Sequence, residues 1–390
     1  MIRFLLIALT SAASAPAPAP PVPAPQQATQ QRPDGAEYWT PSADRMIFIA
    51  TGISFPRQVG AVSFNRSIAF GRNNTGRDNG LIYASDDGEL IASANIYLPG
   101  RADAGFSSVV TEHMIRVQSG SALRVVGRGI TAAGGRDGVA IRADYAGFRE
   151  DNEASSAAFL RVDGWIVKLR VSGPEARRAD VERTMSALLA GLRFSHAPGT
   201  ALAMTVTGDC PPTPPGPPAV LQTPPNANDA AEDAIVAAGT ALHSEDRPDP
   251  RGRPASHNVL PRTWCVSSHR QVGTFQMPIL RIPPSPAAED SQRSVAMALL
   301  NDGDGAIEVV ERRFRNRSRF TMIWHSTGRT NILGTYDGPP TDEQITALIE
   351  GRDDAGSRAR AVIDYETNGN STVTLNVRPD ARTQRAPSSR

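Results

Sequence analysis

Alternating apolar and polar positions predict a series of β-strands in the first half of the chain. Residues 80–98 form two alternating arms around Asp87-Gly88, a dipeptide that favours the tight turn of a β-hairpin. Residues 165–171 alternate in the same way, so one face of this strand is apolar and the other partly polar. The pattern therefore predicts antiparallel strands that each bury one face.

A helical repeat follows the strand at 165–171. Pro174 suits the first turn of a helix. Apolar residues then recur at helical spacing, namely Val181, Met185, Leu188, Leu189 and Leu192, before Gly191 helps to end the helix. We expect this amphipathic helix to cover the sheet. Residues 105–126 are also compatible with a helix, although their pattern is weaker.

The second half alternates between strand and helix patterns. Strands are predicted at 262–270, 273–282, 305–314 and 319–326, and a short helix at 229–244. A second helix begins after Thr341, whose side chain can cap it, with Gln344 three residues later to complete a capping box. A last hairpin turns at Asn368-Gly369.

Two proline-rich stretches divide the chain. Residues 16–35 and 210–229 have too few apolar positions to order themselves. We therefore predict an α+β protein of two domains, each a mainly antiparallel sheet with one or more covering helices, joined by a Pro-rich linker. The predicted boundaries are a signal peptide at 1–15, a disordered tether at 16–35, domain 1 at 36–200, the linker at 201–229, domain 2 at 230–380 and a disordered tail at 381–390.

The first 15 residues have the layout of a secretory signal peptide. Arg3 precedes an apolar core at 4–9, and small residues follow at 10–15. This core is too short to span a bilayer, and no later segment is apolar enough to do so. Abundant arginine, alanine, glycine and proline are typical of GC-rich bacterial genomes. We expect a bacterial periplasmic or secreted protein with no transmembrane segment in the mature chain.

Net charge and cysteine content limit the classes of partner and ligand that we expect. The formal net charge of +1 gives no overall field to hold nucleic acid, so none is expected as a partner. The two cysteines, Cys210 and Cys265, suit one disulfide in an exported chain, worth roughly 4 kcal/mol in the chain-entropy model. Two unrelated thiols are the alternative. Neither cysteine has a partner at metal-ligand spacing.

No catalytic, cofactor or metal site is predicted. The sequence has no nucleophile elbow, zinc-protease helix, phosphate loop or dinucleotide fingerprint. Asp302 and Asp304 resemble part of a calcium loop, but Leu300 stands where a further acid is needed, and a hairpin turn is expected. His269 and His325 lie on predicted strands that could meet, without an evident third ligand. Lys168, the only lysine, is expected to be a cation on a polar strand face rather than a catalytic amine.

The densest charge is a run of arginines at a predicted hairpin tip. If residues 315–318 turn between two strands, the tip carries Arg312, Arg313, Arg315, Arg317 and Arg319. Guanidinium groups bind phosphate and other polyanions bidentately, so this tip is a candidate contact for an anionic envelope component. The alternative is a solvated turn whose charge Glu308 and Glu311 offset.

The first unit has a resemblance that rests on three segments: the turn ISFPRQVGAVSF, the hairpin GLIYASDDGELIASANIYLPG and the stretch DGWIVKLRVSGP before a helix. Together they resemble exported proteobacterial proteins of unassigned function, and their order is similar to the Mog1/PsbP-like α/β sandwich. That resemblance covers about 160 residues and implies a binding or assembly module with no catalytic residue to carry over.

These observations favour a non-catalytic exported binding or assembly factor of the bacterial cell envelope. Another envelope protein is an alternative partner to an anionic component. A secreted hydrolase with a site assembled from distant residues is the alternative function, and a purely structural spacer is a third.

Overall fold

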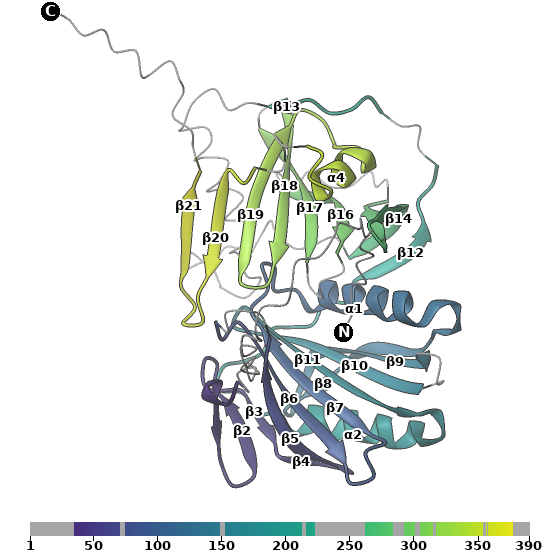
Figure 1. The fold of residues 1–390 in the computed structure, drawn as a ribbon, viewed down its shortest axis with the longest axis vertical. Helices are drawn as coiled ribbons and strands as arrows, with labels where there is room; N and C mark the ends of the chain where they lie inside the picture. Colours follow the sequence, from purple (N-terminus) through teal and green to yellow (C-terminus); the bar gives the residue numbers. More distant parts are fainter. Residues whose placement is uncertain are drawn as a thin grey trace, which may run out of the picture. The chain divides into compact units, whose positions relative to one another are not determined.

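The computed structural model describes residues 35–70, 75–148, 153–212, 216–222, 262–283, 292–300, 305–314, 317–353, 356 and 358–376. Strands predominate over helices within them (Figure 1). The predicted signal peptide, the tether at 16–34, the helix at 229–244 and the C-terminal tail lie outside these residues.

An antiparallel sheet forms from the alternating segments of the first half, as the sequence predicts. Its eight strands run in the order β4 (Gln58–Val59), β5 (Val62–Ala69), β6 (Asp78–Ser85), β7 (Ile91–Tyr97), β11 (Trp165–Pro174), β10 (Glu153–Val162), β9 (Arg136–Phe148) and β8 (Arg124–Ala133). The predicted hairpin is β6–β7, with Tyr83 opposite Ala92. A small sheet of β1 (Trp39–Pro41), β2 (Arg45–Phe48) and β3 (Ser54–Pro56) precedes it, after a 3-10 turn, η1 (Ala36–Tyr38).

Two helices cover opposite faces of this sheet. α2 (Arg178–Gly191) buries Val181, Met185 and Leu188 in one core with Val167 and Leu169 of β11. Pro174 ends β11 rather than opening the helix, because a 3-10 turn, η3 (Glu175–Arg177), intervenes. The alternate side chains of β11 point the other way.

α1 (Ala104–Ser119) covers that other face and is buried on two sides. Ala104 and Ile115 belong to a core with Ile166 of β11. Phe106, Val109 and Val110 belong to a different core with Trp264 and Leu299 from the second half of the chain. A short 3-10 turn, η2 (Gly120–Ala122), connects α1 to β8. The helix therefore has apolar contacts on two sides, and the sequence pattern of 105–126 is correspondingly weak.

The second half builds a ten-stranded sheet. Its order is β12 (Thr205–Asp209), β14 (Thr263–Val272), β15 (Phe275–Arg281), β16 (Gln292–Leu299), β17 (Ala306–Phe314), β18 (Arg317–Ser326), β19 (Arg329–Tyr336), β20 (Ala361–Tyr365) and β21 (Ser371–Leu375), with β13 (Leu221–Gln222) paired to β19. All pairs are antiparallel except β12–β14. α4 (Asp342–Ile349) buries Ile345 and Leu348 in the core on one face.

Local signals in the second half are confirmed. The Thr341 hydroxyl accepts from the Gln344 amide at 3.2 Å, and the Gln344 side chain accepts from the Thr341 amide at 3.1 Å, which completes the capping box. The β20–β21 hairpin turns at Asn368-Gly369, where Gly369 adopts a φ of 86° that suits glycine.

The disulfide between Cys210 and Cys265 is confirmed and joins the end of β12 to β14. Part of the Pro-rich stretch also contacts α4, because the Ala219 main chain exchanges hydrogen bonds with the Gln344 side chain at 3.0 and 2.7 Å. Both sheets belong to one compact unit, Pro33–Arg390, so the division into two domains stays a prediction. Within the described residues no helix is long and apolar enough to cross a membrane.

Removing the disulfide should destabilise the protein. The bridge closes a loop with a sequence separation of 55 residues, so replacing Cys210 and Cys265 by Ser should lower the free energy of unfolding by about 2–4 kcal/mol. Urea unfolding measures the change, with reduced wild-type protein as the control. Equal unfolding midpoints for the oxidised protein and the double variant would contradict the expectation.

Candidate functional site

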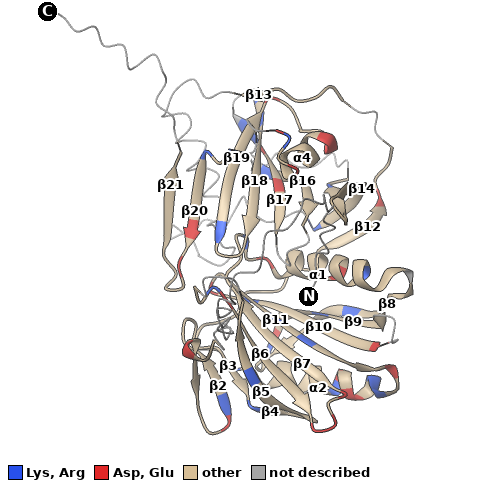
Figure 2. Ribbon diagram, in the orientation of Figure 1, with Lys and Arg blue, Asp and Glu red and all other residues tan. Residues whose placement is uncertain are grey.

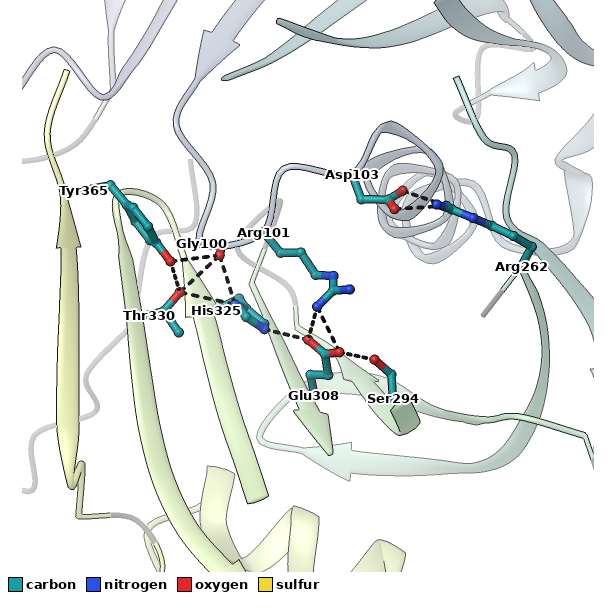
Figure 3. A network of polar contacts seen from close by, with 9 residues as sticks. All are labelled: Gly100, Arg101, Asp103, Arg262, Ser294, Glu308, His325, Thr330 and Tyr365. Carbon is teal, nitrogen blue, oxygen red and sulfur yellow. Dashed lines mark hydrogen bonds and ion pairs between the residues drawn. The ribbon is translucent and has the colours of Figure 1, made fainter. Parts of the chain in front are cut away.

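A network of buried polar side chains lies where the connection between β7 and α1 contacts the second sheet (Figure 3). The connection contributes Gly100, Arg101 and Asp103. Each neighbouring strand of the sheet adds polar groups, which are Ser294 from β16, Glu308 from β17, His325 from β18, Thr330 from β19 and Tyr365 from β20. We call this set the Glu308 network.

Glu308 is the centre of the network and is fully buried. Its carboxylate accepts from Arg101 Nη1 at 2.8 and 3.0 Å and from His325 Nε2 at 2.8 Å. The Ser294 hydroxyl donates to the same carboxylate. The Arg101 side chain is only 8% exposed, so the ion pair is shielded from water. Each oxygen of the buried anion thus has donors, which is the condition for burying a charge.

The surroundings keep Glu308 ionised. Burial alone would raise the pKa of its carboxyl. The Arg101 guanidinium and the donors His325 and Ser294 lower this pKa by more than burial raises it, to about 2. The carboxylate is therefore an anion across the physiological pH range. It cannot act as a general acid near neutrality.

The other side of His325 holds the main chain at Gly100. His325 Nδ1 lies 3.2 Å from the Gly100 carbonyl oxygen and 3.3 Å from Thr330 Oγ1. Thr330 donates to the same carbonyl at 3.1 Å, and the Tyr365 hydroxyl lies 3.1 Å from Thr330 Oγ1. Because Nε2 faces the carboxylate, it carries the proton that the ring donates there. Burial raises the pKa of Tyr365 to about 12, so its hydroxyl stays neutral.

Gly100 is required by close approach rather than by its own conformation. A Cβ atom at this position would lie 2.7 Å from the Arg329 carbonyl oxygen and 2.8 Å from Thr330 Oγ1. The Gly100 amide also donates to Ser326 O at 2.9 Å. The first half of the chain therefore passes directly against the β18–β19 turn.

A second ion pair fixes the start of α1. Asp103 caps the helix by accepting from the Phe106 amide at 2.9 Å. The same carboxylate accepts from Arg262 Nη1 at 2.9 and 3.2 Å, and Arg262 directly precedes β14. Together with Arg101, this contact ties both ends of the β7–α1 connection to the second sheet.

The Glu308 network contains Ser, His and Glu, yet its geometry does not match a hydrolytic triad. The Ser294 hydroxyl donates to Glu308 and makes no hydrogen bond to His325. The network side chains are nearly inaccessible, with Ser294 5% and His325 1% exposed. Neither of two surface hollows in the described chain, one beside α2 and one over β7–β11, is lined by a network residue. The geometry suits holding two parts of the chain together.

The arginine-rich hairpin forms where the sequence predicts it. β17 ends at Phe314 and β18 begins at Arg317, and Arg312 lies opposite Arg319. Strand alternation places Arg312, Arg317 and Arg319 on one face of the hairpin and Arg313 on the other. Arg315 lies outside the described residues. The two strands of the predicted hairpin pair, and the four described arginines divide between its two faces.

Glu311 offsets the charge on one face only. It accepts from Arg293 Nε at 2.7 Å, from Arg313 Nε at 3.3 Å and from Ser318 Oγ at 2.7 Å. Burial raises the pKa of Glu311, and these donors lower it by more, so it stays ionised. Glu308, which the sequence suggested as a second counter-charge, is committed to Arg101 instead.

The opposite face carries three arginines, Arg312, Arg317 and Arg319. Arg317 and Arg319 are exposed, while Arg312 is half-buried and donates from Nη2 to Thr321 Oγ1 at 3.3 Å. Elsewhere Figure 2 shows basic and acidic segments interspersed along both sheets, in keeping with a net charge of +1. This face of the β17–β18 hairpin is the candidate anion-binding surface, and we call it the arginine face.

The remaining candidates do not assemble. His269 on β14 and His325 on β18 are separated by three strands, so these two histidines do not meet. His269 is instead close enough to His113 on α1 to influence it: burial first, and then His269, lower the pKa of His113 to about 4. Among the described residues no group of three or more His, Cys, Asp or Glu could hold a metal ion. Lys168 is half-buried on β11, opposite Asn95 of β7.

Sequence reasoning missed Arg101, Asp103 and Arg262 entirely. Glu308 gave one signal, because it occupies the same strand face as Ala306 and Val310, both of which are buried. A charged residue in an apolar row of a strand indicates either an irregular strand or a buried partner. The identity of that partner, 207 residues away, had no signal.

Comparison with known proteins adds little. No protein-family model matches this chain, and no curated protein matches it. Among solved structures the chain is similar to the solution structure of cyanobacterial PsbP (CyanoP) from Synechocystis sp., at 14% sequence identity and a TM-score of 0.29, over 40% of this chain and 95% of that chain. Kinship with exported proteobacterial proteins stays a prediction.

Breaking the central ion pair should be strongly destabilising. Glu308→Gln removes the carboxylate of the buried ion pair with Arg101, so the free energy of unfolding should fall by about 3–5 kcal/mol. The matched control is Glu343→Gln, the same chemical change at a side chain that is 59% exposed, where the effect should stay within about 0.5 kcal/mol. Urea denaturation measures both. Equal effects of the two variants would argue against a structural role for Glu308.

The stabilisation from Glu308 should depend on pH in a defined direction. Its folded-state pKa of about 2 lies below the ordinary value of 4.5, so the contribution is complete above the ordinary value and is lost as the pH falls towards 2. The difference in unfolding free energy between wild type and Glu308→Gln should therefore shrink between pH 6 and pH 2.5. A difference that stays constant over this range would show that Glu308 is not the anion of the pair.

Proposed function

We propose that the protein is a non-catalytic, exported binding or assembly factor of the bacterial cell envelope that contacts an anionic envelope component. The candidate contact is the arginine-rich hairpin with Arg312, Arg313, Arg315, Arg317 and Arg319. The observation that carries the proposal is the arginine face, where Arg312, Arg317 and Arg319 lie together on one face of the hairpin, while Arg313 pairs with Glu311 on the other.

The arrangement of this face favours an anionic ligand. Arg312 and Arg319 lie directly opposite each other on neighbouring strands, and like charges in that position repel. An anion between guanidinium groups relieves the repulsion and accepts bidentate hydrogen bonds. The exposed end of the hairpin, at Arg317, lets such a ligand approach without any rearrangement of the sheet.

Export is supported by independent features. The Arg3-led apolar segment at the N-terminus has the order of a signal peptide, and the disulfide between Cys210 and Cys265 suits an oxidising compartment. Abundant Arg, Ala, Gly and Pro favour a bacterial source. The periplasm or the cell exterior is therefore the compartment that we propose.

The alternative of a hydrolase has one observation in its favour, the convergence of Ser294, His325 and Glu308. Against it stands their burial, since a substrate would have to displace the connection at Gly100 to reach them. A purely structural spacer would share the Glu308 network but would not need the arginine face. The arginine face is thus the feature that separates a binding factor from a spacer.

Binding to anionic vesicles tests the proposal. Each basic residue near an anionic membrane surface contributes about 1 kcal/mol, so Arg317→Ser combined with Arg319→Ser should weaken binding to phosphatidylglycerol vesicles roughly 30-fold. Binding should also fall with added salt, because exposed charges are screened within roughly 10 Å at 0.1 M ionic strength. Co-sedimentation measures both effects.

The matched control removes two positive charges elsewhere. Arg66 is exposed on β5, and Arg183 on α2 is 72% exposed, so Arg66→Ser combined with Arg183→Ser changes the net charge equally. This control should bind nearly as wild type does. Equal loss of vesicle binding in both double variants would show that net charge alone causes the effect. If wild type does not bind the vesicles, the hairpin is a solvated turn.

A further inference from the structure

Four strands stand at the ends of the strand orders of the two large sheets, and three of them are protected against pairing with another chain. Among the described residues β4 is only two residues long, and β8 carries Arg124 and Arg128. β12 contains Gly208 and Asp209 and ends at the Cys210 disulfide. Short edges, charges and irregular ends are the features by which proteins prevent edge pairing.

β21 lacks all of these features. Its sequence, Ser-Thr-Val-Thr-Leu, has no charge, no proline and no glycine, and all five residues are exposed. Val373 is 41% and Leu375 42% exposed. Figure 1 shows β21 at the outer edge of the second sheet, beyond β20. No other described strand covers its outer side.

The hydrogen bonds around the hairpin show which backbone groups of β21 point outward. The Glu366 amide donates to Asn370 O at 2.9 Å, and the Asn376 amide donates to Arg360 O at 2.8 Å. In an antiparallel pair the residues that bond to the neighbouring strand alternate, so positions 370, 372, 374 and 376 bond towards β20. Ser371, Val373 and Leu375 therefore direct their N–H and C=O groups to the free edge.

The sequence of this edge reads nearly the same in both directions. Residues 370–376 are Asn-Ser-Thr-Val-Thr-Leu-Asn, with Val373 at the centre. If two copies align antiparallel about Val373, Val373 faces itself, each Thr372 faces Thr374, and each Asn370 faces Asn376. Cross-strand Thr pairs and β-branched pairs are favourable, and no like charges meet.

We propose that β21 is a homodimerisation edge, at which two copies of the chain pair antiparallel about a two-fold axis through Val373. In this register Val373 bonds with its symmetry mate and Ser371 bonds with Leu375 of the second copy, which gives ~6 main-chain hydrogen bonds. The second sheet becomes continuous across the dimer. This inference is independent of the anionic ligand, because it uses neither the arginine face nor its charge.

The second copy fits this edge better than an unrelated strand. The outward groups of Ser371, Val373 and Leu375 are matched, in number and spacing, by the same three residues turned about the axis. The exposed apolar side chains Val373 and Leu375 extend a row of buried residues on β20, Ala361 and Ile363. Because only one short strand is shared, the interface is small and the dimer should be reversible and concentration-dependent.

Sedimentation equilibrium on the full-length protein tests the proposal. Wild type should pass from monomer to dimer as concentration rises. Val373→Lys places two like charges opposite each other at the axis and should raise the dimer dissociation constant ~10-fold or more. The matched control is Ile130→Lys on the β8 edge, at a side chain that is 50% exposed, and it should dimerise as wild type does. Circular dichroism confirms that both variants are folded.

A mixing experiment tests the register directly. The native cysteines are paired, so a single introduced cysteine is the only free thiol. Thr372→Cys alone should not cross-link, because the two copies of position 372 lie diagonally, ~7–8 Å apart, at or beyond the reach of a disulfide. Thr374→Cys alone should behave likewise. An equimolar mixture of the two variants should form a disulfide-linked dimer under mild oxidation, because position 372 faces position 374.

Two outcomes overturn the proposal. In the first, the wild-type protein stays monomeric at every concentration and the mixture gives no cross-link. This outcome includes the case in which the monomer binds a different extended peptide at β21. The other is a dimer that forms equally in Val373→Lys and does not cross-link in the mixture, which would place the interface elsewhere. Because no vesicle or other anion is present, neither outcome depends on the ligand of the arginine face.

Discussion

The buried pair between Arg101 and Glu308 is the interaction on which the join between the two halves of the chain depends. Removing both charges from water costs several kcal/mol per ion, so the pair is stable only because the remaining donors and acceptors are satisfied around it. Ser294 and His325 supply those partners from two different strands, and Thr330 with His325 contacts the Gly100 carbonyl. The same contacts hold Gly100 against the β18–β19 turn and thereby fix where α1 begins. α1 then presents one side to the first sheet and another to residues of the second, so its packing follows from the placement of the ion pair.

Features that depend on neighbours in sequence were predictable. The Asp87-Gly88 and Asn368-Gly369 hairpins and the capping box at Thr341 all formed as expected, because turn and cap chemistry is decided within a few residues. α2 was predictable because one apolar stripe faces one sheet. α1 was less so, because it contacts apolar residues on two sides and therefore has no single stripe. Glu308 stood out as a charged residue in an apolar row, but its partner Arg101 had no signal, since the ion pair joins residues 207 positions apart.

The arginine hairpin shows how a correct local prediction can still misplace charge. The sequence alone grouped five arginines and two glutamates at one tip. Strand alternation separates Arg313 and Glu311 from Arg312, Arg317 and Arg319, and the second glutamate, Glu308, turns into the buried network. Successive side chains of a strand point to opposite faces, so the sequence already contained the division of the arginines between two faces. The role of Glu308 required the tertiary structure, because only the approach of Arg101 decides whether that acid offsets the tip or is buried.

The proposed contacts lie on one sheet, which has consequences for how they would act together. The arginine face is formed by β17 and β18, and β21 lies at the edge of the same sheet beyond β19 and β20. Pairing through β21 would therefore place two arginine faces in one continuous sheet. Each face offers only a few guanidinium groups, and a contact of that size with an exposed polyanion is weak and sensitive to salt. Two faces carried by one assembly bind an extended anionic surface with an effective concentration set by their fixed separation, so the second contact adds affinity without any new chemistry. An extended anionic surface would favour the dimer, because only the dimer presents both arginine faces to it. Tight binding through these weak basic patches would therefore require an extended surface.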